Sequence, residues 1–166
     1  MFAIALAAWA GDWGPAAEVR HDEEVAVSYQ ARLEGGFLLV RAKLAPGWHT
    51  FAMDNQRRAA EKLAGKPALS VDRATEIRSS GGLEVAGPWY QTPPKDFSRP
   101  ELRWFSWGFE REAVFAVKAR GSSGKLAVRG QACTDSICKN IDIAVTVTSA
   151  GKGGAAVNLK DLEAVR

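Results

Sequence analysis

The chain lacks any apolar run long enough to cross a membrane, and its charges do not gather into basic runs. A membrane-spanning helix needs about 20 predominantly apolar residues, so we expect that the chain itself spans no membrane. Its 22 Lys and Arg residues against 19 Asp and Glu residues leave a formal net charge of +3, and the two signs are interleaved along all 166 residues. We therefore expect no nucleic-acid partner, because such partners require concentrated positive charge.

Histidine, methionine and cysteine are equally scarce, with two of each. The sequence contains no G-x-S-x-G, H-E-x-x-H or P-loop motif. The two cysteines with His21 and His49 equal four zinc ligands in number, but they lack the close spacing of zinc sites. Two methionines are too few to favour copper. We expect no cofactor, and metal binding is the weakest of the options for the cysteines.

The two histidines also limit any catalytic triad, which would have to use one of them. His21 lies in an N-terminal segment that we expect to be mobile, whereas His49 lies inside an aromatic stretch, Trp48-His49-Thr50-Phe51. A histidine in that setting is more often packed or hydrogen-bonded than a general base. Paired acidic residues elsewhere in the chain are typical of solvated strand faces.

The N-terminus begins with an apolar stretch, Met1 to Ala10, that ends in Ala8-Trp9-Ala10. This pattern is typical of the apolar region and cleavage site of a secretory signal, although the basic residues that usually precede it are missing. We expect residues 1–20 to be a signal-peptide remnant or a disordered N-terminus. An exported protein works in the periplasm or another compartment where disulfides persist.

Alternation of apolar and polar residues dominates the rest of the chain. It predicts a hairpin from the strands around Val25–Tyr29 and Phe37–Lys43, and a secure final strand over Ile141–Thr148. Gln56–Ala64 is made of helix-forming residues and stops at Gly65, which predicts a short helix. Short strands with frequent turns indicate an all-β, immunoglobulin-like antiparallel β-sandwich with a short helical insert.

Three further expectations concern the middle and the end of the chain. Leu69–Val71 is predicted to be a strand, and Gly87–Pro100, which holds four of the seven prolines, is predicted to be a long ordered loop rather than a strand. Long ordered loops are often functional. We expect one sandwich domain over residues 21–150, followed by a flexible tail over 151–166 with a short helix that Asn158 caps.

The most informative segment is Gln131-Ala132-Cys133-Thr134-Asp135-Ser136-Ile137-Cys138. Strands are predicted on both sides, so the cysteines lie at the two ends of a connection that reverses direction, where they can pair. A ring this small restrains the unfolded chain by only about 2 kcal/mol, and a domain of this length does not need it to fold. From spacing alone, a structural disulfide and a pair poised for thiol–disulfide exchange both remain open.

Three motifs together resemble the N-terminal periplasmic domain of DsbD-type thiol:disulfide interchange proteins. They are Gly47-Trp48-His49-Thr50-Phe51, the aromatic stretch Trp104–Phe109 before an apolar strand, and the Q-A-C-T-D-x-x-C block that ends at Cys138. The resemblance runs from about Glu24 to Ser149, and the cysteine block is its most specific part.

The resemblance implies an immunoglobulin-like sandwich whose pair, Cys133 and Cys138, accepts electrons from a transmembrane donor and passes them to thioredoxin-like periplasmic proteins. Cys138 is implied as the nucleophile and Cys133 as the resolving cysteine. An aromatic cap that shields the disulfide is implied within Glu101–Phe105, so Trp104 and Phe105, with His49 and Phe51 from the aromatic strand, are the candidate cap or partner-binding residues.

The sequence also departs from the family. Lys139-Asn140 stands where the family often has two prolines, and the family's transmembrane segment and thioredoxin-like domain are absent, so we expect a standalone version or a fragment. A divergent branch can also lose redox activity. The alternative function is therefore a non-catalytic binding module in which the disulfide is structural.

Overall fold

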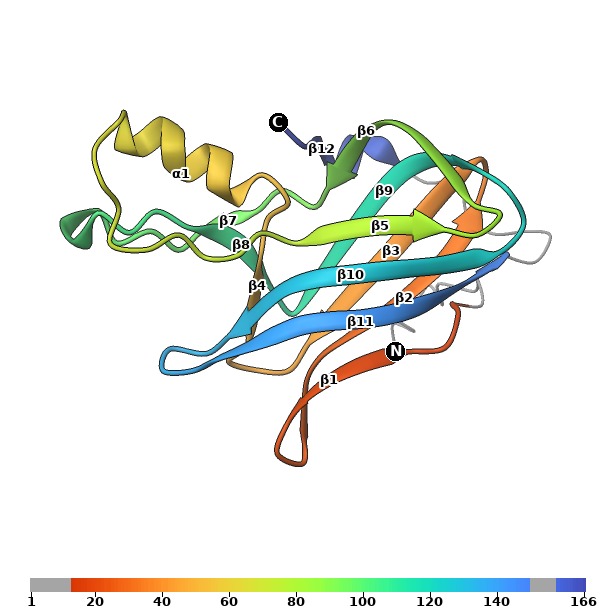
Figure 1. Cartoon of the computed structure of the whole chain (residues 1–166), viewed down its shortest axis with the longest axis horizontal. Helices are drawn as coiled ribbons and strands as arrows, with labels where there is room; N and C mark the ends of the chain where they lie inside the picture. Colours follow the sequence, from red (N-terminus) through yellow and green to blue (C-terminus); the bar gives the residue numbers. More distant parts are fainter. Residues whose placement is uncertain (1–12, 150–157) are drawn as a thin grey trace, which may run out of the picture.

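The computed structural model describes residues 13–149 and 158–166, which form a β-sandwich with one α-helix (Figure 1). The strands are β1 (Ala17–His21), β2 (Glu24–Glu34), β3 (Phe37–Leu44), β4 (His49–Phe51), β5 (Glu76–Ser80), β6 (Glu84–Gln91), β7 (Lys95–Asp96), β8 (Trp107–Glu110), β9 (Glu112–Arg120), β10 (Gly124–Cys133), β11 (Cys138–Ser149) and β12 (Glu163–Ala164). The helices are α1 (Asn55–Leu63) and two 3₁₀ turns, η1 (Pro100–Leu102) and η2 (Leu159–Asp161). In the described residues, no helix has the length and apolar character needed to cross a bilayer.

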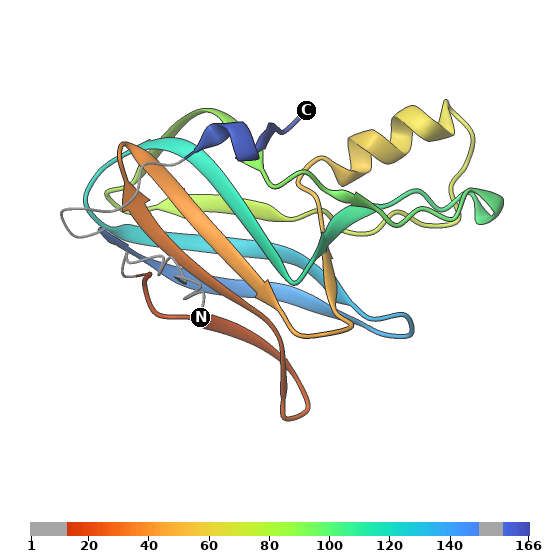
Figure 2. The ribbon, with the colours of Figure 1, turned by 180° about the vertical axis from the view of Figure 1, so that it is seen from behind.

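The strands form two layers around one core. β5, β10 and β11 lie in front of β2, β3 and β9 in Figure 1, and the opposite view in Figure 2 brings β2, β3 and β9 forward. Hydrogen bonding is continuous in the order β12-β6-β9-β3-β2-β11-β10-β4-β8-β7, with β1 on β2 and β5 on β10. All pairs are antiparallel except β11 with β2, so the expectation of a purely antiparallel sandwich is corrected at one point.

The alternation of apolar and polar residues in the sequence matches the burial pattern of the strands. In β10, Leu126 and Val128 are buried, while Lys125 and Arg129 on either side of them are exposed, because neighbouring strand residues point to opposite faces of the sheet. The predicted β2–β3 hairpin turns through Gly35 and Gly36, which both have positive φ. A two-residue turn with that geometry matches the twist of paired strands.

The predicted short helix is confirmed as α1, and buried polar contacts fix its position. The Asn55 amide donates to the Asp72 carbonyl over 2.9 Å, and its side-chain oxygen accepts from the Trp107 backbone N–H over 2.7 Å. The Asp54 carboxylate accepts from Arg58 over 2.8 Å and from Gln91 over 3.0 Å. The helical insert is therefore tied to β6, β8 and the segment before β5.

Two expectations for the middle of the chain are wrong. Leu69–Val71 is not a strand, and Leu69 is 79% exposed, because this segment runs outside the sheet toward β5. Gly87–Pro100 contains the end of β6 and all of β7, because Tyr90 and Gln91 pair with β9 and Lys95 and Asp96 pair with β8. Pro88 lies in β6 where its pairing with β9 shifts register, Pro93 and Pro94 lie between β6 and β7, and Pro100 begins η1.

Residues 158–166 differ from the flexible tail that we expected over 151–166, whereas 151–157 lie outside the described residues. Asn158 caps η2 as predicted, since its side chain accepts from the Lys160 N–H over 3.1 Å, but β12 then pairs with β6. Arg58 forms an ion pair with Glu163, and the Arg166 backbone N–H donates to Asp54 over 3.1 Å. At the other end of the chain, β1 begins inside the segment expected as a leader, whereas the apolar stretch 1–10 lies outside the described residues.

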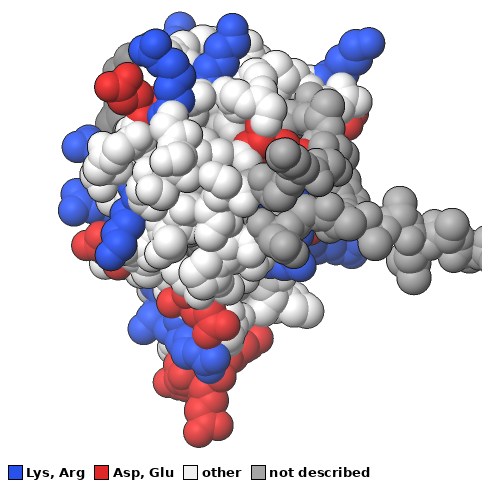
Figure 3. Space-filling view, turned by 90° about the vertical axis from the view of Figure 1, so that its right-hand side faces the viewer, with Lys and Arg blue, Asp and Glu red and all other residues white. Residues whose placement is uncertain are grey.

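Figure 3 views the end of the molecule that lies away from the β10–β11 turn. Basic and acidic side chains lie mainly around its rim, and acidic ones gather at its lower tip, where Figure 1 has the β1–β2 turn. That turn contributes the exposed residues Asp22, Glu23 and Glu24. The cysteine segment occupies the opposite end of the sandwich.

Candidate functional site

The two cysteines face each other across the β10–β11 hairpin. Cys133, the last residue of β10, and Cys138, the first of β11, are directly opposed and form a disulfide, with their Cα atoms 4.1 Å apart. Between them, the Thr134 N–H donates to the Ile137 carbonyl over 2.8 Å, and the Thr134 hydroxyl accepts from the Ile137 N–H over 3.2 Å. The disulfide therefore closes a hydrogen-bonded turn at one end of the sandwich.

The two sulfur-bearing residues differ in exposure. Cys133 is 3% exposed, whereas Cys138 is exposed, as is most of the turn before it. Neighbouring Ile137 is 37% exposed although it is apolar. A partner thiolate that approaches this end of the molecule therefore meets Cys138 first.

A row of side chains continues from the disulfide across the sheet. His49 in β4 is the strand partner of Cys133, and Glu110 in β8 is the strand partner of His49. Directly opposed residues share one face of a sheet, so Cys138, Cys133, His49 and Glu110 lie in register on the outer face of four adjacent strands. The β4–β8 contact is tight, because a Cβ at Gly108 would overlap the Thr50 carbonyl.

Two phenylalanine rings pack on His49. Phe51 contacts it edge-on with ring centroids 5.4 Å apart, and Phe97 stacks on it at 5.0 Å with an interplanar angle of 28°. The Phe97 backbone N–H donates to the Ser106 carbonyl over 2.9 Å, which extends the β7–β8 pairing. Lys95 lies 5.4 Å from the Phe97 ring and forms a 2.8 Å ion pair with Glu110.

Trp104 and Phe105, the cap candidates from the sequence, occupy different surroundings. The Trp104 indole N–H donates to the Asp72 carboxylate over 2.8 Å, and the ring lies beside Arg99. Phe105 is half-buried against the core. The structure thus brings together Cys133, Cys138, His49 and Phe51, and it links Trp104 to the same region through Asp72.

Phe97 is the residue that the sequence reasoning missed. It lies in the proline-rich segment that was singled out as functional, but the cap was expected a few residues later, within Glu101–Phe105. The alternation of Lys95, in β7, and Phe97, the residue directly after β7, was the available signal. That signal is weak because β7 has two residues.

Burial and charge act on the titration of His49 in opposite directions. Burial lowers the pKa of His49, while the carboxylates of Asp72, Asp135 and Glu110 oppose that shift, and the net direction is down. The imidazole is therefore neutral at neutral pH. The hydrogen bond and charge of Lys95 lower the pKa of Glu110, which keeps this side chain a carboxylate.

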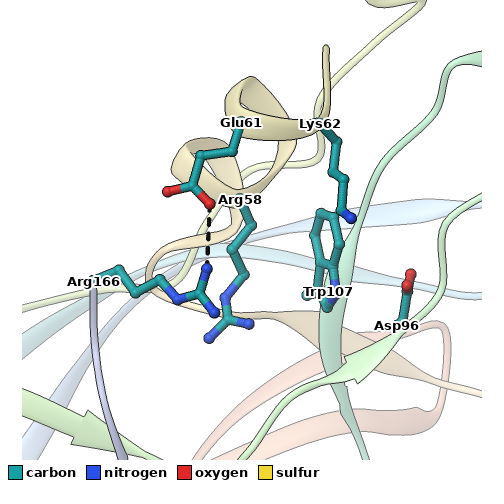
Figure 4. A pocket seen from close by; sticks show the side chains of 6 residues that line it. All are labelled: Arg58, Glu61, Lys62, Asp96, Trp107 and Arg166. Atoms are coloured by element: carbon teal, nitrogen blue, oxygen red, sulfur yellow. Dashed lines mark hydrogen bonds and ion pairs between the residues drawn. The ribbon is translucent and has the colours of Figure 1, made fainter. Parts of the chain in front are cut away.

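A separate pocket of about 380 Å³ lies between α1, β7, β8 and the C-terminal residues (Figure 4). Three basic and two acidic side chains line it together with a tryptophan: Arg58, Lys62, Arg166, Glu61, Asp96 and Trp107. Glu61 and Arg166 form an ion pair across it at 3.2 Å. The pocket contains none of the residues in the cysteine–histidine row.

Comparison with known proteins identifies the fold. No protein-family model matches the chain, and no curated protein matches its sequence. The fold is similar to that of the N-terminal periplasmic domain of ScsB from Proteus mirabilis, with a TM-score of 0.51, 16% identity, and coverage of 81% of this chain and 52% of that one. It is also similar to the reduced N-terminal domain of DsbD from Neisseria meningitidis, with a TM-score of 0.50, 15% identity, and coverage of 85% and 91%.

This likeness confirms the expected DsbD-like, immunoglobulin-like fold. The chain spans about half the length of the ScsB structure and most of the DsbD domain. At these identities the similarity establishes the fold alone. The chain is thus a DsbD-N-like sandwich that carries a disulfide at the end of one hairpin.

Proposed function

We propose that this chain performs thiol–disulfide exchange through Cys133 and Cys138, in the periplasm or another exported compartment. The observation that carries the proposal is the asymmetric disulfide: an exposed Cys138 bonded to a buried Cys133 at the end of a hairpin that a large core already holds in place. The bond can be opened from one side without disrupting the fold around it.

In the reduced domain, the Cys138 thiolate attacks a partner disulfide, and one partner sulfur leaves as a thiolate. Cys133 then attacks the Cys138 sulfur of the mixed disulfide, which restores the intramolecular bond and releases the second partner thiolate. Two electrons pass from the cysteine pair to the partner. A membrane-bound donor reduces the Cys133–Cys138 disulfide again, and thioredoxin-like proteins accept the electrons, as the resemblance to DsbD implies.

The expected domain over 21–150 contains every residue of this exchange site, and we propose Phe97, with His49 and Phe51, as its aromatic shield. Phe97 stacks on the residue beside Cys133, and the Lys95–Glu110 ion pair holds its strand in place. Trp104 and Phe105 are proposed to support the surrounding loop and a partner surface.

The competing function is a non-catalytic binding module, which the near-complete burial of Cys133 favours. The reduction potential of the cysteine pair, measured by equilibrating the full chain in glutathione or dithiothreitol buffers, distinguishes the exchange function from the binding module. Exchange predicts that the pair titrates with a potential above about −300 mV, whereas a structural bond resists reduction and lies below that value.

A further inference from the structure

The register of four strands places an imidazole beside the buried cysteine and a carboxylate beside the imidazole. Cβ atoms of directly opposed strand residues lie about 4.5–5.5 Å apart. His49 is thus the neighbour of Cys133 on the side away from Cys138, and Glu110 is the next neighbour in the same row. The sequence separates His49 from Cys133 by more than eighty positions and from Glu110 by about sixty, so strand pairing is what reveals that they are neighbours.

The exchange reaction needs a proton acceptor at this position. Cys133 must be a thiolate to attack the mixed disulfide, yet it is almost fully buried, and burial favours the neutral thiol. His49 is half-buried between Phe51 and Phe97, and burial lowers its pKa so that its neutral form is available. The charged groups that face it are Asp72, Asp135 and Glu110, the last paired with Lys95.

We propose that His49 accepts the proton of the Cys133 thiol in the step that resolves the mixed disulfide, and that Glu110 is a positioning residue for the imidazolium that forms. The inference rests on the exchange function proposed above. The S–H bond of Cys133 breaks and an N–H bond forms on His49, while the Cys133 sulfur bonds to the Cys138 sulfur. The bond between Cys138 and the partner breaks, and the partner thiolate leaves with the electron pair.

The gain available from such a base can be bounded. A thiol with a pKa of about 8.5 is roughly 3% ionised at pH 7, so complete ionisation accelerates attack by about 30-fold at most. Loss of His49 is therefore expected to slow the resolving step by about 10- to 30-fold at neutral pH.

The test uses the reduced full chain and dithiobis-nitrobenzoate, an aromatic disulfide that releases a coloured thiolate. The first release reports attack by Cys138, and the second reports attack by Cys133 on the mixed disulfide. Stopped-flow records of both phases across pH are compared for the wild type, His49→Gln, Glu110→Gln and His21→Gln. The last is the matched control, because it makes the same substitution at the other histidine, outside the row.

The proposal predicts that His49→Gln slows the second phase and moves its pH midpoint up toward that of an unassisted thiol, while the first phase changes little. Glu110→Gln should give a smaller change in the same direction, and His21→Gln none. Equal second phases in the wild type and His49→Gln would overturn the role of His49 and leave exchange intact. Absence of a second release in the wild type would overturn the exchange function itself.

A second measurement requires no change at His49. The His49 imidazole is titrated by NMR in the reduced wild type and in reduced Cys133→Ser. Adjacent groups that exchange a proton titrate as a coupled pair, so the midpoint of His49 should shift when the thiol is replaced. Identical titration curves in the two proteins would overturn the proposal.

Discussion

The proposed role of Phe97 as an aromatic shield of the disulfide can be tested directly. Its ring stacks on His49 at 5.0 Å, directly beside the strand position of Cys133. An aromatic pair of this kind contributes about 0.5–1.5 kcal/mol beyond area burial. Phe97→Ala removes that contribution, so the fraction of molecules in which the buried Cys133 side of the disulfide is uncovered should rise by about 2- to 13-fold.

The assay is the rate of reduction of the oxidised chain by excess dithiothreitol, with timed alkylation of the thiols and mass analysis. Phe97→Ala should be reduced about 2- to 13-fold faster than the wild type. Trp104→Phe, which removes the indole donor to Asp72 but keeps an aromatic ring, is the control and should leave the rate close to that of the wild type. An unchanged rate in Phe97→Ala together with acceleration in Trp104→Phe would refute the assignment and return the shield to Glu101–Phe105.

The remaining predictions concern stability and salt. Cys133→Ser/Cys138→Ser should lower the free energy of unfolding by about 2 kcal/mol in urea titrations, because the ring is small. Asp54→Asn should cost about 3 kcal/mol, since it breaks a buried ion pair. Although burial opposes the shift, hydrogen bonds from Arg58, Gln91 and the Arg166 N–H lower the pKa of Asp54 from 3.8. The stabilisation by the Asp54 carboxylate is therefore present above pH 3.8 and is lost as the pH falls through the lowered pKa. In acid denaturation, the stabilities of the wild type and Asp54→Asn should converge. Lys95→Met should speed reduction only slightly and weaken its salt dependence, because the Lys95–Glu110 ion pair is exposed and screened by salt.

The fold was largely predictable because its information is local. Alternation in Val25–Tyr29 and Ile141–Thr148 marked strands with one buried face, and the helix-forming run before Gly65 marked α1. The opposition of Cys133 and Cys138 also followed from two flanking strands and a short connection. These features depend on neighbouring residues and on period-two patterning.

The features that the sequence did not predict depend on distant partners. Glu163 and Ala164 follow a glycine-rich segment and looked unstructured, yet the edge of β6 and the Arg58–Glu163 ion pair hold them. β7 exists only because β8 pairs with it, despite the prolines nearby. The His49–Glu110 pairing likewise depends on strand order, which no local pattern reports.

The small ring that joins Cys133 to Cys138 also sets how strongly the stability of the fold depends on the redox state of the cysteine pair. A stabilisation of about 2 kcal/mol corresponds to only about 45 mV for a two-electron couple. In the proposed exchange, the free energy of unfolding of the sandwich would therefore differ by only about 2 kcal/mol between the oxidised and the reduced cysteine pair. The reduction potential of the Cys133–Cys138 pair would then depend mainly on the residues around the sulfur atoms. Substitutions there can change the potential without destabilising the sandwich.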